Sequence, residues 1–267
     1  MFGEILSDQV RLGLTQAAMA SLLALAVVWM ARWRGVHIER ESVVALARGL
    51  IQVVLVGAVL MVMLQGPTWT SVLILIVMMI AAAETSGRRA KKLPGAFWDS
   101  LWGVSIGSGV VILLMTAVGV IEMSVASLVP VGSMIVANAM NSASLALDRF
   151  RAEVETHAGQ IEAGLALGAD PKAVVAPYVH RAVEASLIPR IDNLRTLGIV
   201  WIPGLMAGMI LSGSDPVYAA IYQFVVLAMI FAAGGLTSVV TLAFLRMRVF
   251  SPAAQLTLRT GGNSSAK

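Results

Sequence analysis

The stretch Ile161-Glu162-Ala163-Gly164-Leu165-Ala166-Leu167-Gly168-Ala169-Asp170-Pro171 lies inside a polar segment, 148–188, that interrupts an otherwise apolar chain. Gly168 fits the position just after a helix end, where a positive φ is common. Asp170 fits an N-cap, and Pro171 fits the first residue of the helix that follows. The stretch therefore predicts a helix, a tight turn and a second helix.

The two helices of this pair have bounds that the sequence also predicts. Residues 149–167 are rich in helix formers, so we expect the first helix there. Pro177 should kink the second helix, and Ile188-Pro189 should end it.

The rest of the chain has the composition of a membrane protein. It has 267 residues, of which 58% are hydrophobic and 13% charged, and its mean hydropathy is +0.85. Soluble domains carry about twice that charged fraction. We therefore predict an all-α polytopic membrane protein with about seven spanning helices. The predicted spans are 10–31, 42–64, 68–84, 98–121, 125–147, 192–212 and 215–245.

The distribution of positive charge predicts how the spans are oriented. The connections around 65–67, 121–124 and 212–216 contain no Lys or Arg, whereas the other connections contain nearly all of them. By the positive-inside rule, the polar segment and the C-terminus are cytoplasmic and the N-terminus is outside. We expect a single transmembrane domain over 1–259 and a disordered cytoplasmic tail over 260–267.

Composition also excludes several functions. The chain has no cysteine, which excludes disulfides and thiolate metal sites. Its net charge of +4 follows from the cytoplasmic loops and does not predict nucleic-acid binding. The first ten residues lack an early Lys/Arg cluster and do not resemble a cleaved signal peptide.

The helix pair resembles the coupling motif of ATP-binding-cassette permeases, in which an acidic and a small residue are followed by a glycine. A short helix that docks in a groove of an ATPase needs small side chains on its contact face, and an acidic group there can pair with a basic one. The residues that would make this contact are Glu162, Ala163, Leu165, Gly168, Ala169 and Asp170. The alternative is an amphipathic linker that lies on the membrane surface.

Further motifs occur in a specific order. They are Arg48-Gly49-Leu50-Ile51-Gln52-Val53-Val54-Leu55-Val56-Gly57, Ala137-Asn138-Ala139-Met140-Asn141, Leu165-Ala166-Leu167-Gly168-Ala169, Ile188-Pro189, Leu197-Gly198, Ile202-Pro203-Gly204-Leu205-Met206-Ala207-Gly208-Met209-Ile210-Leu211 and Tyr222-Gln223. Together they resemble the Fet-type permease family of ABC transporters, over about residues 40–250. That family includes the bacterial iron-export permease and a plant relative in aluminium tolerance.

The resemblance implies a permease subunit in the bacterial inner membrane that pairs with a separate ATPase. It also implies a homodimer, so that two permeases join two ATPases, and export of iron from the cytoplasm. ATP and Mg²⁺ would bind the partner subunit, and no cofactor would bind this chain. The chain has no G-x-x-x-x-G-K-[ST] loop, so we expect it to be a non-catalytic subunit.

Polar residues within the spans are candidates for the transport pathway. Arg48 and Gln52 lie one turn apart in the second span. Arg48 either makes a substrate or gating contact or extends its side chain to the cytoplasmic interface of the membrane. Glu84 ends the third span, where it either binds a cation or pairs with Arg88 or Arg48.

The later spans contain a second group of candidates. Asn138 and Asn141 lie on one helix face and either line a pathway or bond between helices. Met206 and Met209 offer soft sulfur ligands but are more often packing residues. Gln223 is a plausible bundle-facing group. The sequence does not identify a metal site.

Other classes fit less well. Gly103-Val104-Ser105-Ile106-Gly107 matches a serine-nucleophile pattern, but its small residues also suit helix packing, and no base is near. A retinal protein would need a lysine in the last span, and a receptor would need larger outer loops. A secondary transporter would carry intramembrane carboxylates and inverted repeats. A non-metal solute, such as a nucleotide sugar, remains an alternative cargo for a permease.

Overall fold

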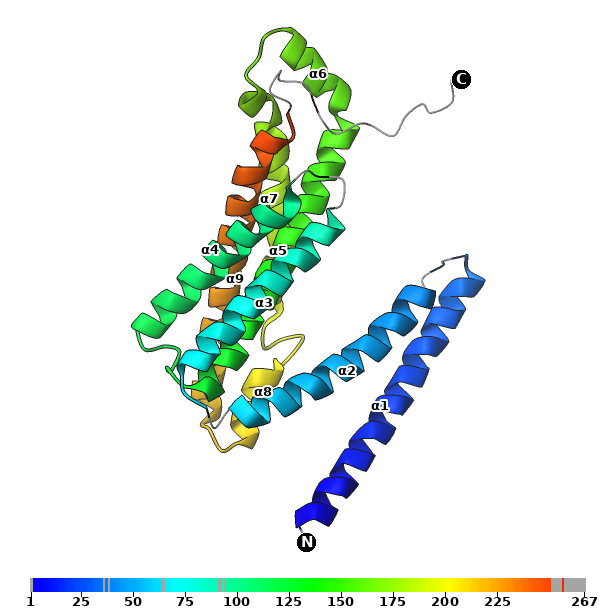
Figure 1. Ribbon diagram of the computed structural model, residues 1–267, viewed down its shortest axis with the longest axis vertical. Coiled ribbons are helices and arrows are strands. Elements are labelled where there is room, and N and C mark those ends of the chain that lie inside the picture. The colour runs from blue at the N-terminus through cyan, green and yellow to red at the C-terminus, as the bar shows by residue number, and fades with distance from the viewer. Residues whose placement is uncertain are drawn as a thin grey trace. The chain divides into compact units, whose positions relative to one another are not determined.

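The computed structural model describes residues 2–35, 37, 39–63, 66–90, 93, 95–250 and 256. The chain forms two compact units, Met1–Gly66 and Pro67–Lys267. In the described part of both units, every regular element is a helix (Figure 1). The predicted tail, 260–267, lies outside the described residues.

The first unit is a helical hairpin made of α1 (Phe2–Trp33) and α2 (Glu39–Met63). An ion pair of 3.3 Å between Arg32 and Glu39 joins the end of one helix to the start of the other. None of the apolar stretch of α1 is buried within the protein. Lipid is the solvent that such a surface requires.

The second unit is a bundle that extends into a helical tip. Its helices are α3 (Trp69–Arg89), α4 (Ala96–Ala117), α5 (Val125–Thr156), α6 (Ala158–Ala166), α7 (Pro171–Thr196), α8 (Gly204–Leu211) and α9 (Pro216–Arg248). Helices α3, α4, α5 and α9 pack on one another, and α7 packs along α5 and α9. Helix α6 lies at one end of this bundle (Figure 1).

Two glycines of α4 let α9 approach closely. A Cβ atom on Gly103 would lie 1.9 Å from Thr241 Oγ1, and one on Gly107 would lie 2.1 Å from Thr237 Oγ1. Small residues at this spacing are typical of helix contacts in membranes. The packing interpretation of Gly103-Val104-Ser105-Ile106-Gly107 is therefore confirmed.

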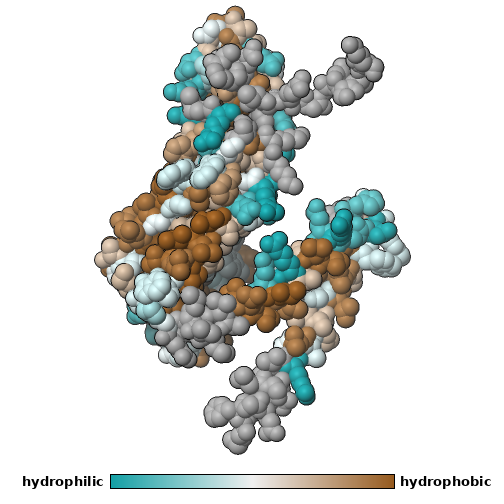
Figure 2. Space-filling model, in the orientation of Figure 1, coloured by the Kyte–Doolittle hydropathy of each residue, from teal (hydrophilic) through white to brown (hydrophobic). Residues whose placement is uncertain are grey.

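The membrane class is confirmed as well. Five helices in the described part of the chain are long and apolar enough to cross a membrane: 11–33, 69–89, 96–117, 125–156 and 216–246. Hydrophobic side chains gather on the visible face of the bundle, and hydrophilic ones are more frequent towards α6 (Figure 2). The chain is an all-α polytopic membrane protein. The number of spans and the outside position of the N-terminus stay predictions.

The predicted helix over 192–212 is wrong. Helix α7 continues to Thr196 and stops, and only the eight residues of α8 are helical beyond it. Gly198 has a φ of +75°, which breaks the helix. Pro203 disfavours helical geometry at the residue before it and starts α8. The sixth apolar stretch is therefore discontinuous.

Two predicted bounds of the helix pair are also wrong. Residues 149–167 are not one helix, because α5 ends at Thr156 and α6 starts after His157. The second helix does not end at Ile188-Pro189, since α7 contains both Pro177 and Pro189 and runs to Thr196. Its packing against α5 and α9 offsets the backbone hydrogen bonds that the prolines remove.

Candidate functional site

The turn between α6 and α7 has the geometry that the sequence predicts. Gly168 has a φ of +83°. The Ala169 amide donates to the Gly164 carbonyl at 3.0 Å, and the Gly168 amide donates to the Leu165 carbonyl at 2.9 Å. This pair of bonds is the Schellman arrangement, which fixes the direction in which the chain leaves a helix.

The start of α7 is capped as predicted. Asp170 has an extended backbone, and its side chain accepts a 3.4 Å hydrogen bond from the Lys172 amide. Pro171 occupies the first turn of α7. Local hydrogen bonds therefore stabilise the turn on both sides, at the end of α6 and at the start of α7.

Helix α6 has one buried and one open face. Ile161 is fully buried and packs in a cluster with Val175 and Tyr178 of α7. The other face contains small or acidic residues, and it is exposed. Of the predicted coupling residues, Leu165 is half-buried and the rest are exposed: Glu162, Ala163, Gly168, Ala169 and Asp170. A surface of this kind can enter a groove on a partner protein.

A buried carboxylate holds this tip on the bundle. Glu153 is 8% exposed, and its two oxygens lie 2.9 Å from Arg149 Nη2 and 3.3 Å from Arg181 Nη1. His157 donates from Nδ1 to the Glu153 carbonyl at 2.8 Å and stacks on Tyr178 at 4.9 Å. Arg181 and Tyr178 belong to α7, so these contacts join α7 to the end of α5 and to His157, the residue that precedes α6. We call Glu153, Arg149, Arg181, His157 and Tyr178 the Glu153 cluster.

Among the pathway candidates, Glu84 has a structural partner. Arg88 Nη2 lies 2.6 Å from Glu84 Oε1, both on the exposed face of α3. Of the alternatives for Glu84, the structure shows the pair with Arg88, and a role of Glu84 in a pathway stays a prediction. Arg48 and Gln52 are exposed on α2, in the first unit.

The two asparagines of α5 have different surroundings. The Asn138 side chain is half-buried and donates to the Met134 carbonyl of its own helix at 2.8 Å. The Asn141 side chain is exposed. A role of either in a pathway stays a prediction.

Gln223 positions the short helix α8. It is 1% exposed, and its Oε1 accepts a 3.3 Å hydrogen bond from the Met206 amide in the first turn of α8. Met209, one turn further on, lines a cavity of about 330 Å³ together with Glu122 and Tyr222. The hydrogen bond between the Met206 amide and Gln223 therefore joins α8, in the discontinuous stretch, to α9.

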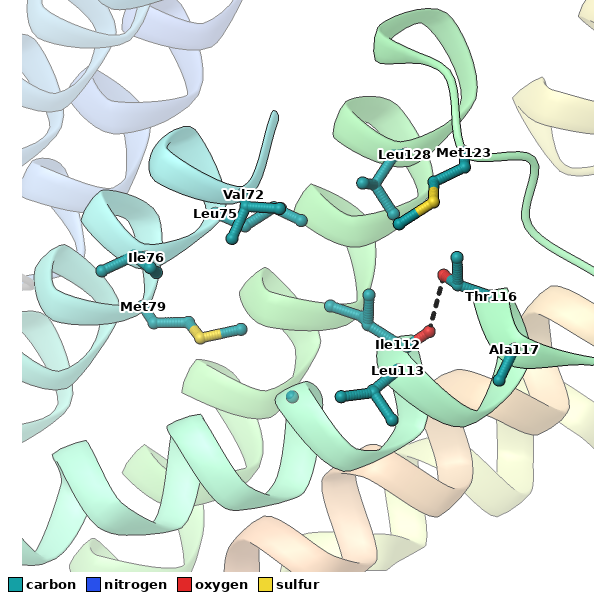
Figure 3. Close-up of a pocket in the computed structure, with 11 residues that line it drawn as sticks. Val72, Leu75, Ile76, Met79, Ile112, Leu113, Thr116, Ala117, Met123 and Leu128 are labelled. Carbon is teal, nitrogen blue, oxygen red and sulfur yellow. Dashed lines mark hydrogen bonds between the residues drawn. The ribbon is translucent and has the colours of Figure 1, made fainter. Parts of the chain in front are cut away.

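An apolar groove of about 430 Å³ lies between α3, α4 and the start of α5. Figure 3 shows Met79, Ile112 and Leu128 among its lining residues. Its one hydroxyl, on Thr116, donates to the Ile112 carbonyl at 2.8 Å. The side chains of the groove therefore offer a cation no free oxygen or nitrogen ligand, only the thioether sulfurs of Met79 and Met123, and the apolar lining suits a hydrocarbon chain.

Besides Glu153, two buried charges were not identified from the sequence. Asp99, at the start of α4, is fully buried and lies 3.1 Å from Arg248 Nε at the end of α9. Arg190 of α7 is 9% exposed, and its Nη2 donates to the Asn138 carbonyl of α5 at 3.3 Å. The only sequence signal for Arg190 is one basic residue in the apolar run Ile188-Pro189-Arg190-Ile191.

Metal-binding chemistry finds little support in this arrangement. Within the described ranges, no group of three or more His, Cys, Asp or Glu side chains converges as a metal site would require. The carboxylates of Glu84 and Asp99 are both paired with arginine.

The fold and the tip define an α-helical membrane protein with a protruding helical connection between α5 and α7. The sequence profile of the Uncharacterised protein family UPF0014 matches residues 14–250, and the chain belongs to that family.

Similar proteins come from bacteria and plants. The UPF0014 membrane protein slr1647 of Synechocystis sp. is 31% identical over 89% of this chain and 93% of its own length. The "Probable iron export permease protein FetB" of Escherichia coli is 30% identical over 87% of this chain and 90% of its own. The UPF0014 membrane protein STAR2 of rice is 30% identical over 91% and 85%. The predicted family resemblance is confirmed. No solved structure matches the chain.

Proposed function

We propose that the chain is the membrane-spanning permease subunit of an ATP-binding-cassette transporter, in which a separate ATPase docks on the α6 tip. The observation that carries this proposal is the exposed face of α6, where the side chains of Glu162 and Ala163 are open to a partner protein. On the opposite face, the buried Ile161 packs α6 against α7.

The Glu153 cluster supports a mechanical role for this tip. It joins the end of α5, next to α6, to α7, and α7 packs along α5 and α9. A push on α6 would therefore move α7 relative to the span helices. ATP-driven closure of two ATPases would in this way switch a permease homodimer between inward-open and outward-open states.

The proposed cargo is iron or another metal, exported across the plasma membrane of a bacterium. This part of the proposal rests on the printed name of the Escherichia coli relative and on the resemblance described above. ATP and Mg²⁺ belong to the ATPase subunit. The sequence contains no phosphate-binding loop of its own, so the permease subunit would not hydrolyse ATP.

The Ala163→Arg variant tests docking. Because Ala163 is exposed, the long cationic side chain should fold normally but obstruct the contact face of α6. We expect recovery of an ATPase subunit with the tagged chain to fall about tenfold or more, as for a clash in the centre of an interface. Recovery is measured as ATP hydrolysis by the purified complex and by identification of a co-purified chain that carries a phosphate-binding loop.

Ala152→Arg is the matched control, because Ala152 is an exposed α5 residue outside α6. It should leave ATPase recovery unchanged. Equal recovery with both variants would contradict docking on α6. A wild-type chain that transports in ATP-free vesicles without a partner would contradict the whole proposal.

A further inference from the structure

Arg190 is a buried cation without a carboxylate partner in the described structure. Its side chain makes one described hydrogen bond, to the main-chain carbonyl of Asn138, and its buried Nε has no partner. A guanidinium has five N–H donors in a planar fork that matches carboxylate and phosphate groups. Most of the binding capacity of Arg190 is therefore unused.

The position of Arg190 makes this arrangement costly. The first charged residue of α5 after Val125 is Asp148. Asn138 lies ten residues before it, about 15 Å along the helix axis at ~1.5 Å per residue. The guanidinium that contacts Asn138 thus lies well inside the uncharged stretch of α5. Charged groups at such depth typically line a substrate pathway or bind a counter-ion.

Helix α7 connects this cation to the tip. From Pro171 to Arg190 it is one helix, about 28 Å long at ~1.5 Å per residue. Pro189 removes a backbone hydrogen bond next to Arg190, and the helix stops at Thr196. A displacement of α6 can therefore change the contact between Arg190 and α5. Discontinuous helices of this kind form substrate sites in other transporters.

The sign of the embedded charge gives the class of cargo. Within the same unit, the buried Asp99 at the start of α4 is paired with Arg248, whereas the charge of Arg190 has no such partner among the described residues. Within the described part of the chain, no group of three or more acidic or histidine side chains converges to offset the charge of Arg190. A bare divalent cation would be repelled by such a pathway, and an anion would be attracted.

We infer that Arg190 is the contact for an anionic cargo that bears carboxylate or phosphate groups, so that a metal would leave as an anionic chelate rather than as a bare ion. This inference rests on the proposed permease function and narrows its substrate. Binding of the anion by the free N–H donors would accompany the movement of α7 away from α5.

The test uses the permease–ATPase complex in lipid nanodiscs and four probes: citrate, iron(III) citrate, uridine diphosphate glucose and Fe²⁺ alone. The dissociation constant and the concentration that half-maximally stimulates ATP hydrolysis are measured for each. We expect the wild type to bind at least one anion more tightly than Fe²⁺. Comparison of iron(III) citrate with uridine diphosphate glucose distinguishes a metal chelate from an organic phosphate.

Arg190→Gln should weaken binding of that anion about 10- to 100-fold, the loss expected for one charge-assisted hydrogen-bonded contact. Arg190→Lys keeps the charge and should lose less. Arg195→Gln is the matched control, because Arg195 lies on the same helix with its side chain 76% exposed, and it should bind like the wild type.

Three results would overturn the inference: tightest wild-type binding of Fe²⁺, no binding of any anion, or unchanged anion binding by Arg190→Gln. If Arg190→Gln does not fold, the inference is tested by two other measurements: the preference of the wild type for anions over Fe²⁺, and the anion affinity of Arg190→Lys. Failure of the proposed function is separate, since it would appear as loss of the ATPase from the wild-type complex.

Discussion

Replacement of Gly107 by alanine is expected to lower the free energy of unfolding of the bundle by about 2 to 3 kcal/mol, the upper part of the range for overpacking of a core. The new Cβ atom would lie 2.7 Å from the Thr237 amide nitrogen and 2.9 Å from the Ala233 carbonyl oxygen. Because these are backbone atoms of α9, a side-chain rotation cannot relieve the clash. Helices α4 and α9 must separate instead.

Gly109→Ala is the control for this experiment. Gly109 lies in the same helix, but a Cβ atom there has nothing within 4 Å. Alanine is favoured over glycine in a helix by up to about 1 kcal/mol, so this variant should be neutral or more stable. Equilibrium unfolding in mixed detergent micelles measures the stability of both variants. Equal stability of the two variants would show that α4 and α9 do not pack at Gly107 as described.

Replacement of Glu153 by alanine is expected to destabilise the tip. The buried carboxylate is the shared partner of Arg149 and Arg181, and its loss leaves both cations without it. Each arginine side chain is more than half exposed, which reduces the cost below that of a fully buried pair. We expect a loss of about 2 kcal/mol, between the values for exposed and buried ion pairs.

The effect should be local as well as global. Amide hydrogen exchange should increase in α6 and the start of α7 more than in α4 and α9, because the cluster joins the end of α5, from which α6 continues, to α7. Glu184→Ala, at an exposed position of α7, should leave both exchange and stability unchanged. Unchanged exchange in α6 of Glu153→Ala would mean that the hydrophobic contacts of Ile161 alone hold the tip.

The turn at the tip could be predicted from sequence because its determinants are local. Gly168, Asp170 and Pro171 each have a conformational preference that does not depend on the rest of the fold. The structure gives Gly168 a positive φ and caps α7 with Asp170, as those preferences require. Long apolar helices could be predicted for the same reason, since hydropathy and length suffice.

The discontinuous stretch could not be predicted from hydropathy. Residues 192–212 are apolar enough for a span, but Gly198 and Pro203 interrupt the backbone within it. The reverse error occurs at Pro189, where a local helix-breaking signal is overcome by packing of α7 on α5 and α9. Local backbone preferences decide the first case, and tertiary contacts, which a single sequence does not show, decide the second.

Some residues of the candidate site are determined by local sequence, and others are determined by tertiary contacts. The exposed face of α6 follows from local sequence, so the residues Glu162 and Ala163 could be identified before the structure. Arg190 could not, because its contact with Asn138 joins positions 52 residues apart. The same holds for Glu153, which has an ordinary helical sequence context and becomes buried only when α7 packs beside it.

The most direct test of the account is the accessibility of a single thiol at the tip. The chain has no cysteine, so Leu167→Cys introduces the only one, at a side chain that is 89% exposed. We predict that a membrane-impermeant maleimide modifies it from the cytoplasmic side alone, and that a bound ATPase subunit protects it. Modification from the external side, or equal modification with and without the ATPase, would contradict the proposed mechanism.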